Sequence, residues 1–258
     1  MFAEQTSSAK MKREEELIEA AKKGHLEEVR RLIYIGVDFR AKQNMALGMA
    51  VSHGHLKVVQ FLIFCGANLD EVDDWALSEI VSPAKLEVVK YLILNAPGKF
   101  KFKPVALRWA ARYGQMEIAK LLLQIGYNLR IDEDVALDLA SANGQVEMVI
   151  FLLQNGADVH ACRDRALVDA AYNGHLSVVK ILVEKGANIH IGEDVNPSGI
   201  RSGNKPLFWA VSNGHSDVVK FLIEAGVDVN SHRGVLPEAV RKGNTEIVNI
   251  ILQAGYVL

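Results

Sequence analysis

The chain has little of what marks a membrane protein, a secreted protein or a polyanion-binding protein. None of its 258 residues lies in an apolar run of the roughly eighteen residues that span a bilayer, and the opening residues lack an apolar signal core. Lysine and arginine number 29 against 31 for aspartate and glutamate, so no overall field favours nucleic acid, membranes or basic partners. These absences predict an intracellular, cytoplasmic protein with no membrane contact.

The sequence also lacks the motifs of phosphate binding, hydrolysis and metal binding. It holds no glycine-rich phosphate loop, no Gly-x-Ser-x-Gly turn and no paired Cys-x-x-Cys. His53 and His55 have no third ligand at metal-site spacing, and the acidic residues at 70–74 lack the glycine and closing glutamate of a calcium loop. We therefore expect no enzyme activity, no catalytic residue, no cofactor and no metal.

Glycine, in contrast, recurs with a period of thirty residues. One series comprises Gly24, Gly54, Gly114, Gly144 and Gly174, continued after an insertion by Gly214 and Gly243. A second series follows twelve residues later, at Gly36, Gly66, Gly126, Gly156, Gly186, Gly226 and Gly255. A fixed period of this size indicates stacked supersecondary units, in which function belongs to an extended surface.

Each period contains the pattern of two short helices. In residues 166–189 the apolar positions at helical spacing are Leu167, Ala170 and Ala171, then Leu176, Val179 and Leu182. Gly174 and Gly186 stand where each helix must stop in a left-handed conformation. Helices this short are unstable alone, so stacking of units must supply the stability.

The segment Gly-His-Leu-x-Val-Val-x-x-Leu-Val-x-x-Gly-Ala-Asn at residues 174–188 resembles the ankyrin repeat, and the match recurs eight times over residues 14–258. The resemblance implies an all-α ankyrin-repeat solenoid of about eight stacked helix-turn-helix units with very short connecting hairpins. The expected units lie near residues 14–43, 44–73, 74–103, 104–133, 134–163, 164–203, 204–232 and 233–258. Residues 1–13 are expected to be disordered or to form an N-terminal extension.

The units depart from the usual ankyrin pattern at their start. Most are 30 residues long and begin with Ala-Leu, as at Ala166-Leu167, whereas the family's usual unit has about 33 residues and begins Thr-Pro-Leu-His. The connecting hairpin should therefore be shortened to little more than a turn, for example at residues 132–134. Such shortened repeats are similar to the arrays of giant DNA viruses and some intracellular microbes, which would imply an adaptor or competitor acting in a host cell.

The two cysteines are expected to be free thiols. Cys65 and Cys162 fall in units three apart, and stacked helix pairs advance by roughly 10 Å each, so about 30 Å separates them. That distance exceeds disulfide reach, which agrees with a reducing compartment.

Histidine and tryptophan recur at fixed places in the unit. Four histidines follow the turn glycine, where the resemblance implies hydrogen bonds that tie the turn together; they are His25, His55, His175 and His215. Trp109 and Trp209 occupy equivalent positions in the first helix. Packing in the core and a role as binding hot spots are both open for these two side chains.

Two irregular segments leave alternatives open. Residues 99–104 carry Lys99, Lys101 and Lys103 between aromatic residues, so they form either a loop packed on the core or a patch that contacts nucleic acid. Residues 190–204 are an insertion rich in turn-forming residues, which is either neutral or part of the binding face.

The resemblance places partner binding on the concave face, at the two residues that precede each turn glycine. These positions vary from unit to unit while the packing residues repeat. The candidate protein-binding residues are Ser52, His53, Arg112, Tyr113, Asn143, Tyr172, Asn173, Ser212 and Asn213. The prediction is a monomeric, non-enzymatic module for an unknown protein or peptide, with direct nucleic-acid contact through residues 99–103 or a purely structural spacer as alternatives.

Overall fold

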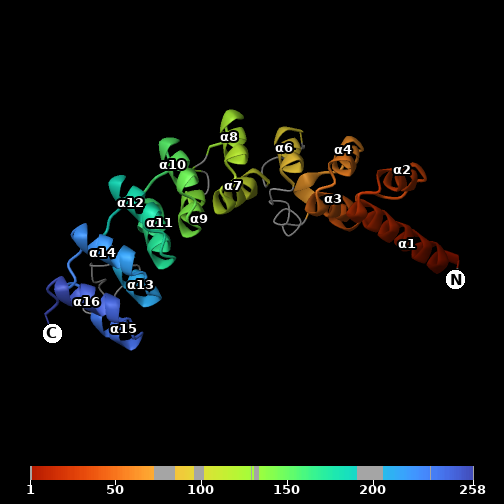
Figure 1. The fold of residues 1–258 in the computed structure, drawn as a ribbon. Coiled ribbons are helices and arrows are strands. Elements are labelled where there is room, and N and C mark those ends of the chain that lie inside the picture. Colours follow the sequence, from red (N-terminus) through yellow and green to blue (C-terminus); the bar gives the residue numbers. More distant parts are fainter. Residues whose placement is uncertain are drawn as a thin grey trace, which may run out of the picture. The chain divides into compact units, whose positions relative to one another are not determined.

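A computed structural model of the chain describes residues 2–72, 85–95, 102–128, 130, 134–190, 206–232 and 234–257 (Figure 1). Throughout this described part the regular structure is helical, and it contains no strand. The elements are α1 (Phe2–Lys23), α2 (Leu26–Tyr34), α3 (Ala41–His53), α4 (Leu56–Phe64), the 3₁₀ turn η1 (Leu69–Glu71), α6 (Leu86–Asn95), α7 (Phe102–Tyr113), α8 (Met116–Gln124), α9 (Val135–Ala142), α10 (Val146–Gln154), α11 (Ala161–Tyr172), α12 (Leu176–Glu184), α13 (Pro206–Asn213), α14 (Ser216–Glu224), α15 (Val235–Arg241) and α16 (Thr245–Gln253). The predicted all-α class is confirmed.

The pair α11 and α12 shows how the repeated sequence forms its two helices. The side chains of Leu167, Ala170 and Leu182 are fully buried, as the helical spacing predicts. Gly174 follows the first helix with φ 75° and Gly186 follows the second with φ 95°. Both glycines are therefore left-handed helix stops, because a side chain disfavours this conformation.

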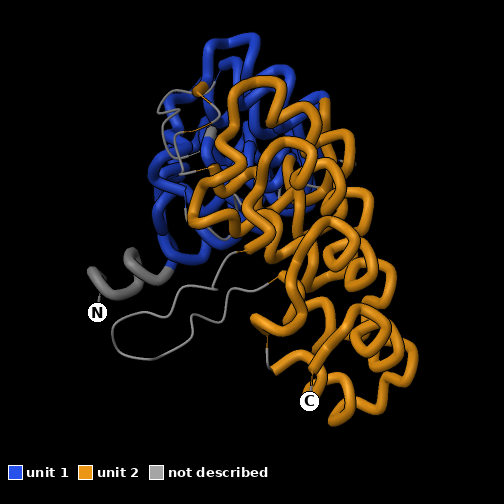
Figure 2. Tube along the Cα trace, turned by 90° about the vertical axis from the view of Figure 1, so that its left-hand side faces the viewer, with its two compact units in different colours: residues 1–110, 117–127 blue, residues 111–116, 128–258 orange. Residues whose placement is uncertain are grey.

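The chain divides into two compact units (Figure 2). Unit 1 comprises Met1–Ala110 and Glu117–Tyr127, and unit 2 comprises Ala111–Met116 and Asn128–Leu258. In unit 2 the first helices α9, α11, α13 and α15 pack in succession, and the second helices α10, α12, α14 and α16 form a parallel row (Figure 1). In unit 1, α1 packs on α3, α2 on α4 and α4 on α6. Each unit is thus a stack of two helical layers.

Hydrogen bonds from the residue after the turn glycine join neighbouring repeats. The ring Nε2 atoms donate to the carbonyl two residues before the preceding turn glycine: His55 to Lys22 at 2.8 Å, His175 to Ala142 at 3.1 Å and His215 to Tyr172 at 2.9 Å. Gln145, which takes the place of the histidine after Gly144, makes the equivalent bond: its Nε2 atom donates to the Arg112 carbonyl at 3.3 Å. The expected bonds are therefore present for His55, His175 and His215, and they hold one repeat to the next.

At two described connections, 42–44 and 162–164, a left-handed turn takes the place of the connecting hairpin. Lys42, Gln43 and Asn44 have φ angles of 52°, 57° and 55°, and 162–164 repeat this conformation with φ between 50° and 61°. Asp134 also lies in the left-handed region, at φ 60°, while 131–133 lie outside the described residues. Non-glycine residues adopt this conformation at a cost of about 1 kcal/mol each, and Asn and Asp tolerate it best.

The last residue of each left-handed turn is buried and polar. Asn44 Nδ2 donates to Glu71 Oε2 at 2.6 Å. Asp164 Oδ1 accepts from the Asn188 backbone N–H at 2.9 Å and lies 2.8 Å from His160 Nδ1. These bonds link the turn to the loop after the following helix pair, so they offset the strain of the left-handed backbone.

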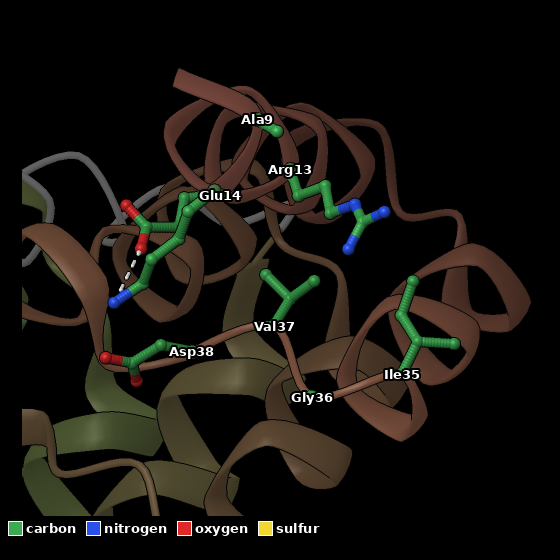
Figure 3. A pocket seen from close by; sticks show the side chains of 8 residues that line it. Ala9, Arg13, Glu14, Ile35, Gly36, Val37 and Asp38 are labelled. Atoms are coloured by element: carbon green, nitrogen blue, oxygen red, sulfur yellow. Dashed lines mark ion pairs between the residues drawn. The ribbon is translucent and has the colours of Figure 1, made fainter. Parts of the chain in front are cut away.

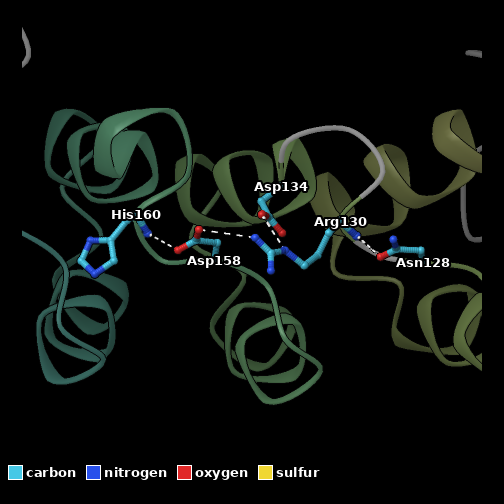
Figure 4. A network of polar contacts seen from close by, with 5 residues as sticks. All are labelled: Asn128, Arg130, Asp134, Asp158 and His160. Carbon is cyan, nitrogen blue, oxygen red and sulfur yellow. Dashed lines mark hydrogen bonds and ion pairs between the residues drawn. The ribbon is translucent and has the colours of Figure 1, made fainter.

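A further polar network ties consecutive loops together in unit 2 (Figure 4). Arg130 lies 3.4 Å from Asp134 in its own repeat and 3.4 Å from Asp158 in the next loop. The Asn128 side chain accepts the backbone N–H of Arg130 at 2.9 Å, and Asp158 accepts that of His160 at the same distance. In the same way, the side chains of Asp38, Asn188 and Asp228 each accept a hydrogen bond from the backbone N–H two residues later.

The first helix is longer than its counterparts. α1 runs without interruption from Phe2 to Lys23, so residues 2–13 continue directly into the first repeat. Whether residues 1–13 are disordered or form an extension stays a prediction. The division of 14–258 into eight units stays a prediction, because residues 73–84 and 191–205 lie outside the described part.

Candidate binding surface

In unit 2 the first helices end in exposed polar and aromatic side chains. Tyr172 is 45% exposed, and Asn143, Asn173 and Asn213 are also exposed. Their positions repeat from α9 to α11 to α13, because each precedes a turn glycine. We call this surface of unit 2, from α9 to α15, the first-helix face.

The asparagines on this face also terminate their own helices. Asn143 Nδ2 donates to the Leu139 carbonyl at 2.8 Å. Asn173 and Asn213 make the same bond four residues back, to Asp169 at 2.9 Å and to Trp209 at 3.0 Å. Since the last carbonyls of a helix lack intrahelical partners, these amides have a structural role that the sequence prediction missed.

Arg112 and Tyr113 lie at the start of unit 2 in the sequence, and both are exposed. The Arg112 guanidinium sits 5.7 Å from the centre of the Tyr113 ring, within cation–π distance. Ser212 is less available: its hydroxyl donates to Glu238 Oε1 at 2.8 Å. Hydrogen bonds from Arg241 and Ser212 lower the pKa of Glu238 to about 2, so this carboxylate stays ionised at neutral pH.

Ser52 and His53 belong to unit 1 and form a separate pair. Ser52 is only 5% exposed, and its hydroxyl donates to the Met49 carbonyl at 3.2 Å. His53 is exposed, with Nδ1 3.0 Å from the same carbonyl. Burial therefore leaves the Ser52 side chain little surface with which to contact a partner, because the α3 backbone occupies it.

Aromatic side chains cluster beside the first-helix face. The rings of Tyr172 and Trp209 meet edge to face at 5.4 Å, and those of Phe208 and Trp209 at 5.6 Å. Trp209 and Trp109 are both half-buried. Trp209 therefore packs on neighbouring rings, while its role as a binding hot spot stays a prediction.

The sequence reasoning missed an acidic pair on neighbouring helices. Asp138 on α9 is 7% exposed, and Asp169 on α11 is half-buried. The pKa of Asp138 is raised to about 7, chiefly by burial and also by the nearby Asp169, while Arg165 opposes the shift. The available signal was aspartate at two first-helix positions that are not acidic in neighbouring repeats: Asp169 stands at the position of Met49 and Leu139, and Asp138 at that of Gly48 and Val168.

Unit 1 contains a small open cavity away from these side chains (Figure 3). It measures about 380 Å³ and lies between α1 and the loop after α2, lined by Arg13, Glu14, Ile35 and Val37 among others. Lys10 and Glu14 form a 3.9 Å ion pair at its rim. Two mobile charged side chains and an open mouth are poor features for tight small-molecule binding.

The two irregular segments that the sequence singled out fall largely outside the described residues. Residues 99–101 and 191–205 lie outside the described part of the chain, as do the side chains of residues 102 and 103.

Within the described part, no group of His, Cys, Asp or Glu has the arrangement of a metal site. No described helix is both long enough and apolar enough to cross a membrane. Neither Cys65 nor Cys162 forms a disulfide bond.

Comparison with known families agrees with this geometry. A family model of three ankyrin repeats matches residues 77–163 and 167–257, and a model of many ankyrin repeats matches residues 17–63. The chain therefore belongs to the ankyrin repeat family. Ankyrin repeats generally mediate protein–protein interaction, and proteins built from them are typically non-enzymatic. No curated protein matches the chain.

Proposed function

We propose that the chain is a non-enzymatic protein-binding module that receives a partner protein or peptide on its concave face, with unit 2 supplying the first-helix face. The observation that carries this proposal is the contrast between constant packing residues and varied exposed residues. The described first helices bury similar small and branched side chains, yet the positions before the turn glycine hold different residue types.

The composition of the face supports this proposal. Arg112, Tyr113 and Tyr172 are exposed, and these residue types most often anchor protein interfaces. Trp209 lies against Tyr172, so an anchor residue of the partner would meet a preformed aromatic surface. The thirty-residue period is the only support for extending the proposal to an adaptor or competitor in a host cell.

Replacement of the anchors tests the proposal. The immobilised full chain captures partners from a cell lysate, and the captured protein is then titrated against purified variants. We expect Arg112→Ala with Tyr113→Ala and Tyr172→Ala to weaken the complex at least tenfold, by about 1.4 kcal/mol or more, without loss of helical content. The matched control carries Glu147→Ala and Lys220→Ala, which lie exposed on the second helices α10 and α14.

Three results would contradict the proposal. Equal loss of affinity in the control variant would move the contact to the second helices. Absence of any captured protein would favour the structural spacer. Capture of nucleic acid, with affinity that falls steeply with salt and disappears when Lys99, Lys101 and Lys103 are replaced, would favour the basic loop.

A further inference from the structure

Three consecutive second helices of unit 1 carry an exposed apolar side chain near their C-terminal ends. Tyr34 on α2 is 93% exposed, Phe64 on α4 is 87% exposed and Leu94 on α6 is 49% exposed. We call these three residues the apolar row. Because α2 packs on α4 and α4 on α6, the three helix ends follow one another within unit 1 (Figure 1). With about 10 Å between the axes of packed helices, the row extends over roughly 20 Å.

The fold does not require apolar side chains at this position. The three residues are thirty apart, and the other repeats hold glutamine or glutamate there: Gln124, Gln154, Glu184, Glu224 and Gln253. All five of these polar side chains are exposed. Single exposed apolar residues are ordinary on a protein surface, but a contiguous patch that includes two aromatic rings is typical of an interaction site.

A groove lies beside the apolar row, between α2 and α4. It measures about 500 Å³. The residues that line it are Glu27, Arg30, Arg31, Ile33, Tyr34 and Phe61. The surface therefore offers projecting rings and a hollow next to them. An interface between identical copies related by a two-fold axis needs both features on one surface, because each patch must be complementary to itself.

The charges on α2 also match those of a second copy. Glu27 lies 3.1 Å from Arg30, and Glu28 lies 2.6 Å from Arg31. The two acidic residues precede the two basic ones along the helix. A two-fold axis that sets two copies of α2 antiparallel therefore places the glutamates of one copy beside the arginines of the other, which favours this pairing.

The area of the exposed rings is near the lower limit of a specific interface. A buried aromatic side chain covers about 150–250 Å², so burial of Tyr34 and Phe64 in two copies removes roughly 600–1,000 Å² from water. Leu94 and the lining of the groove bring the total toward the approximately 1,200 Å² at which specific interfaces begin. An interface of this size predicts reversible association.

We propose that the apolar row and the groove beside it form a two-fold interface with a second copy of the chain, in which the rings of each copy pack against the groove of the other. The inference goes beyond the proposed function, because the apolar row shares no residue with the first-helix face. A dimer would carry two first-helix faces, so a partner with two contact sites would be bound more tightly through avidity.

Sedimentation equilibrium of the purified full chain measures the association. We expect the mean mass to rise with concentration from 28.4 kDa toward twice that value, with a dissociation constant of about 10 µM or weaker. A mass that remains at the monomer value up to about 1 mM would overturn the proposal and agree with the monomer expected from the sequence.

The double variant Tyr34→Gln with Phe64→Gln tests the apolar row. It gives both positions the side chain found in other repeats, and it should raise the dissociation constant at least about tenfold. The matched control carries Ile150→Gln and Leu252→Gln, which make the same kind of change at exposed apolar residues on the second helices α10 and α16 of unit 2. Equal weakening by both variants would indicate non-specific association and overturn the interface.

Charge exchange on α2 tests whether the occupant is a second copy. Glu27→Arg with Glu28→Arg, and separately Arg30→Glu with Arg31→Glu, leave charges of one sign on this face, so each variant alone should associate at least about tenfold more weakly. An equal mixture of the two variants should associate again, because opposite charges then meet. Failure of the mixture to associate would overturn the antiparallel contact between two copies of α2.

The dimer and the proposed function fail in different experiments. If the chain stays monomeric while a protein captured from lysate loses affinity for the Tyr34→Gln, Phe64→Gln variant, the apolar row binds another protein and the dimer proposal falls. If the chain dimerises as described but captures no partner, the dimer stands and the module function falls.

Discussion

The same left-handed turn ends in a hydrogen-bond donor in unit 1 and in a hydrogen-bond acceptor in unit 2. In unit 1 it ends in Asn44, whose amide donates to the Glu71 carboxylate. In unit 2 it ends in Asp164, whose carboxylate accepts from the Asn188 backbone N–H. The backbone conformation selects Asn or Asp, because their short polar side chains tolerate positive φ. The partner in the following loop then decides which of the two fits.

The units also differ where their second helices end. In unit 1 three second helices end in apolar, exposed side chains, Tyr34 at 93%, Phe64 at 87% and Leu94 at 49%, whereas α8 ends in the exposed Gln124. The equivalent exposed residues of unit 2 are Gln154, Glu184 and Glu224. Unit 2 instead places its unusual chemistry on the first helices, with Asp138, Asp169 and the aromatic cluster. A shared scaffold therefore carries different surfaces on different layers.

The largest expected effect comes from alanine at a turn glycine that faces a histidine of the next repeat, compared with a turn glycine that does not. In Gly174→Ala the new Cβ would meet the His215 ring, which is fixed by its bond to the Tyr172 carbonyl. In Gly54→Ala the Cβ would lie 3.0 Å from Cγ of Lys85, a flexible stem that can move. We expect losses of about 2–4 kcal/mol for Gly174→Ala and about 1 kcal/mol for Gly54→Ala, measured by urea unfolding.

Gly186→Ala separates the two causes of this loss. Nothing lies within 4 Å of a Cβ at this position, although φ is 95°. The cost should therefore be the left-handed conformation alone, about 1 kcal/mol. If Gly174→Ala costs no more than Gly186→Ala, the histidine contact between repeats contributes little.

Exchange of the turn residues tests the polarity difference. Asn44→Asp would place a second carboxylate against Glu71 and remove the bond between them, so it should cost about 2 kcal/mol at pH 7. Asp164→Asn keeps an oxygen that can accept from Asn188 and His160, so it should cost about 1 kcal/mol or less. Urea unfolding at pH 7 measures both values.

A pH series provides the control for this pair. The Asn44→Asp penalty should shrink on acidification toward pH 4, where a carboxyl of the pair can be protonated. A penalty that stays constant with pH would show that repulsion from Glu71 is not its cause.

The helix pairs could be predicted from the sequence, but the connections between them could not. Glycine period and apolar spacing predicted α11, α12 and their left-handed stops, since both follow from local backbone and burial rules. The pattern also predicted a shortened hairpin. It did not reveal three consecutive left-handed residues at Lys42–Asn44, because propensity scales disfavour them and only the bonds to a distant loop make them stable.

The candidate surface was predictable in position and less so in chemistry. The residues before the turn glycine lie at the ends of the first helices, as in Tyr172 and Asn173. The burial of Ser52 could not be predicted, because it depends on how α3 packs and not on the local sequence pattern. Asp138 escaped notice because an acidic residue in a helix reads as solvent-exposed, whereas the neighbouring helix α11 covers it.

The smallest expected effect tests whether the apolar ends of the second helices in unit 1 matter to its fold. Tyr34→Gln with Phe64→Gln gives unit 1 the polar pattern of unit 2. Both side chains are almost fully exposed, so the free energy of unfolding should change by no more than about 0.5 kcal/mol. The matched variant Leu32→Gln places the same amide at a fully buried position of α2 and should cost at least about 3 kcal/mol, measured by urea unfolding. A loss of 1 kcal/mol or more in the double variant would mean that these rings stabilise unit 1, so the difference between the units would belong to the core and not to the surface.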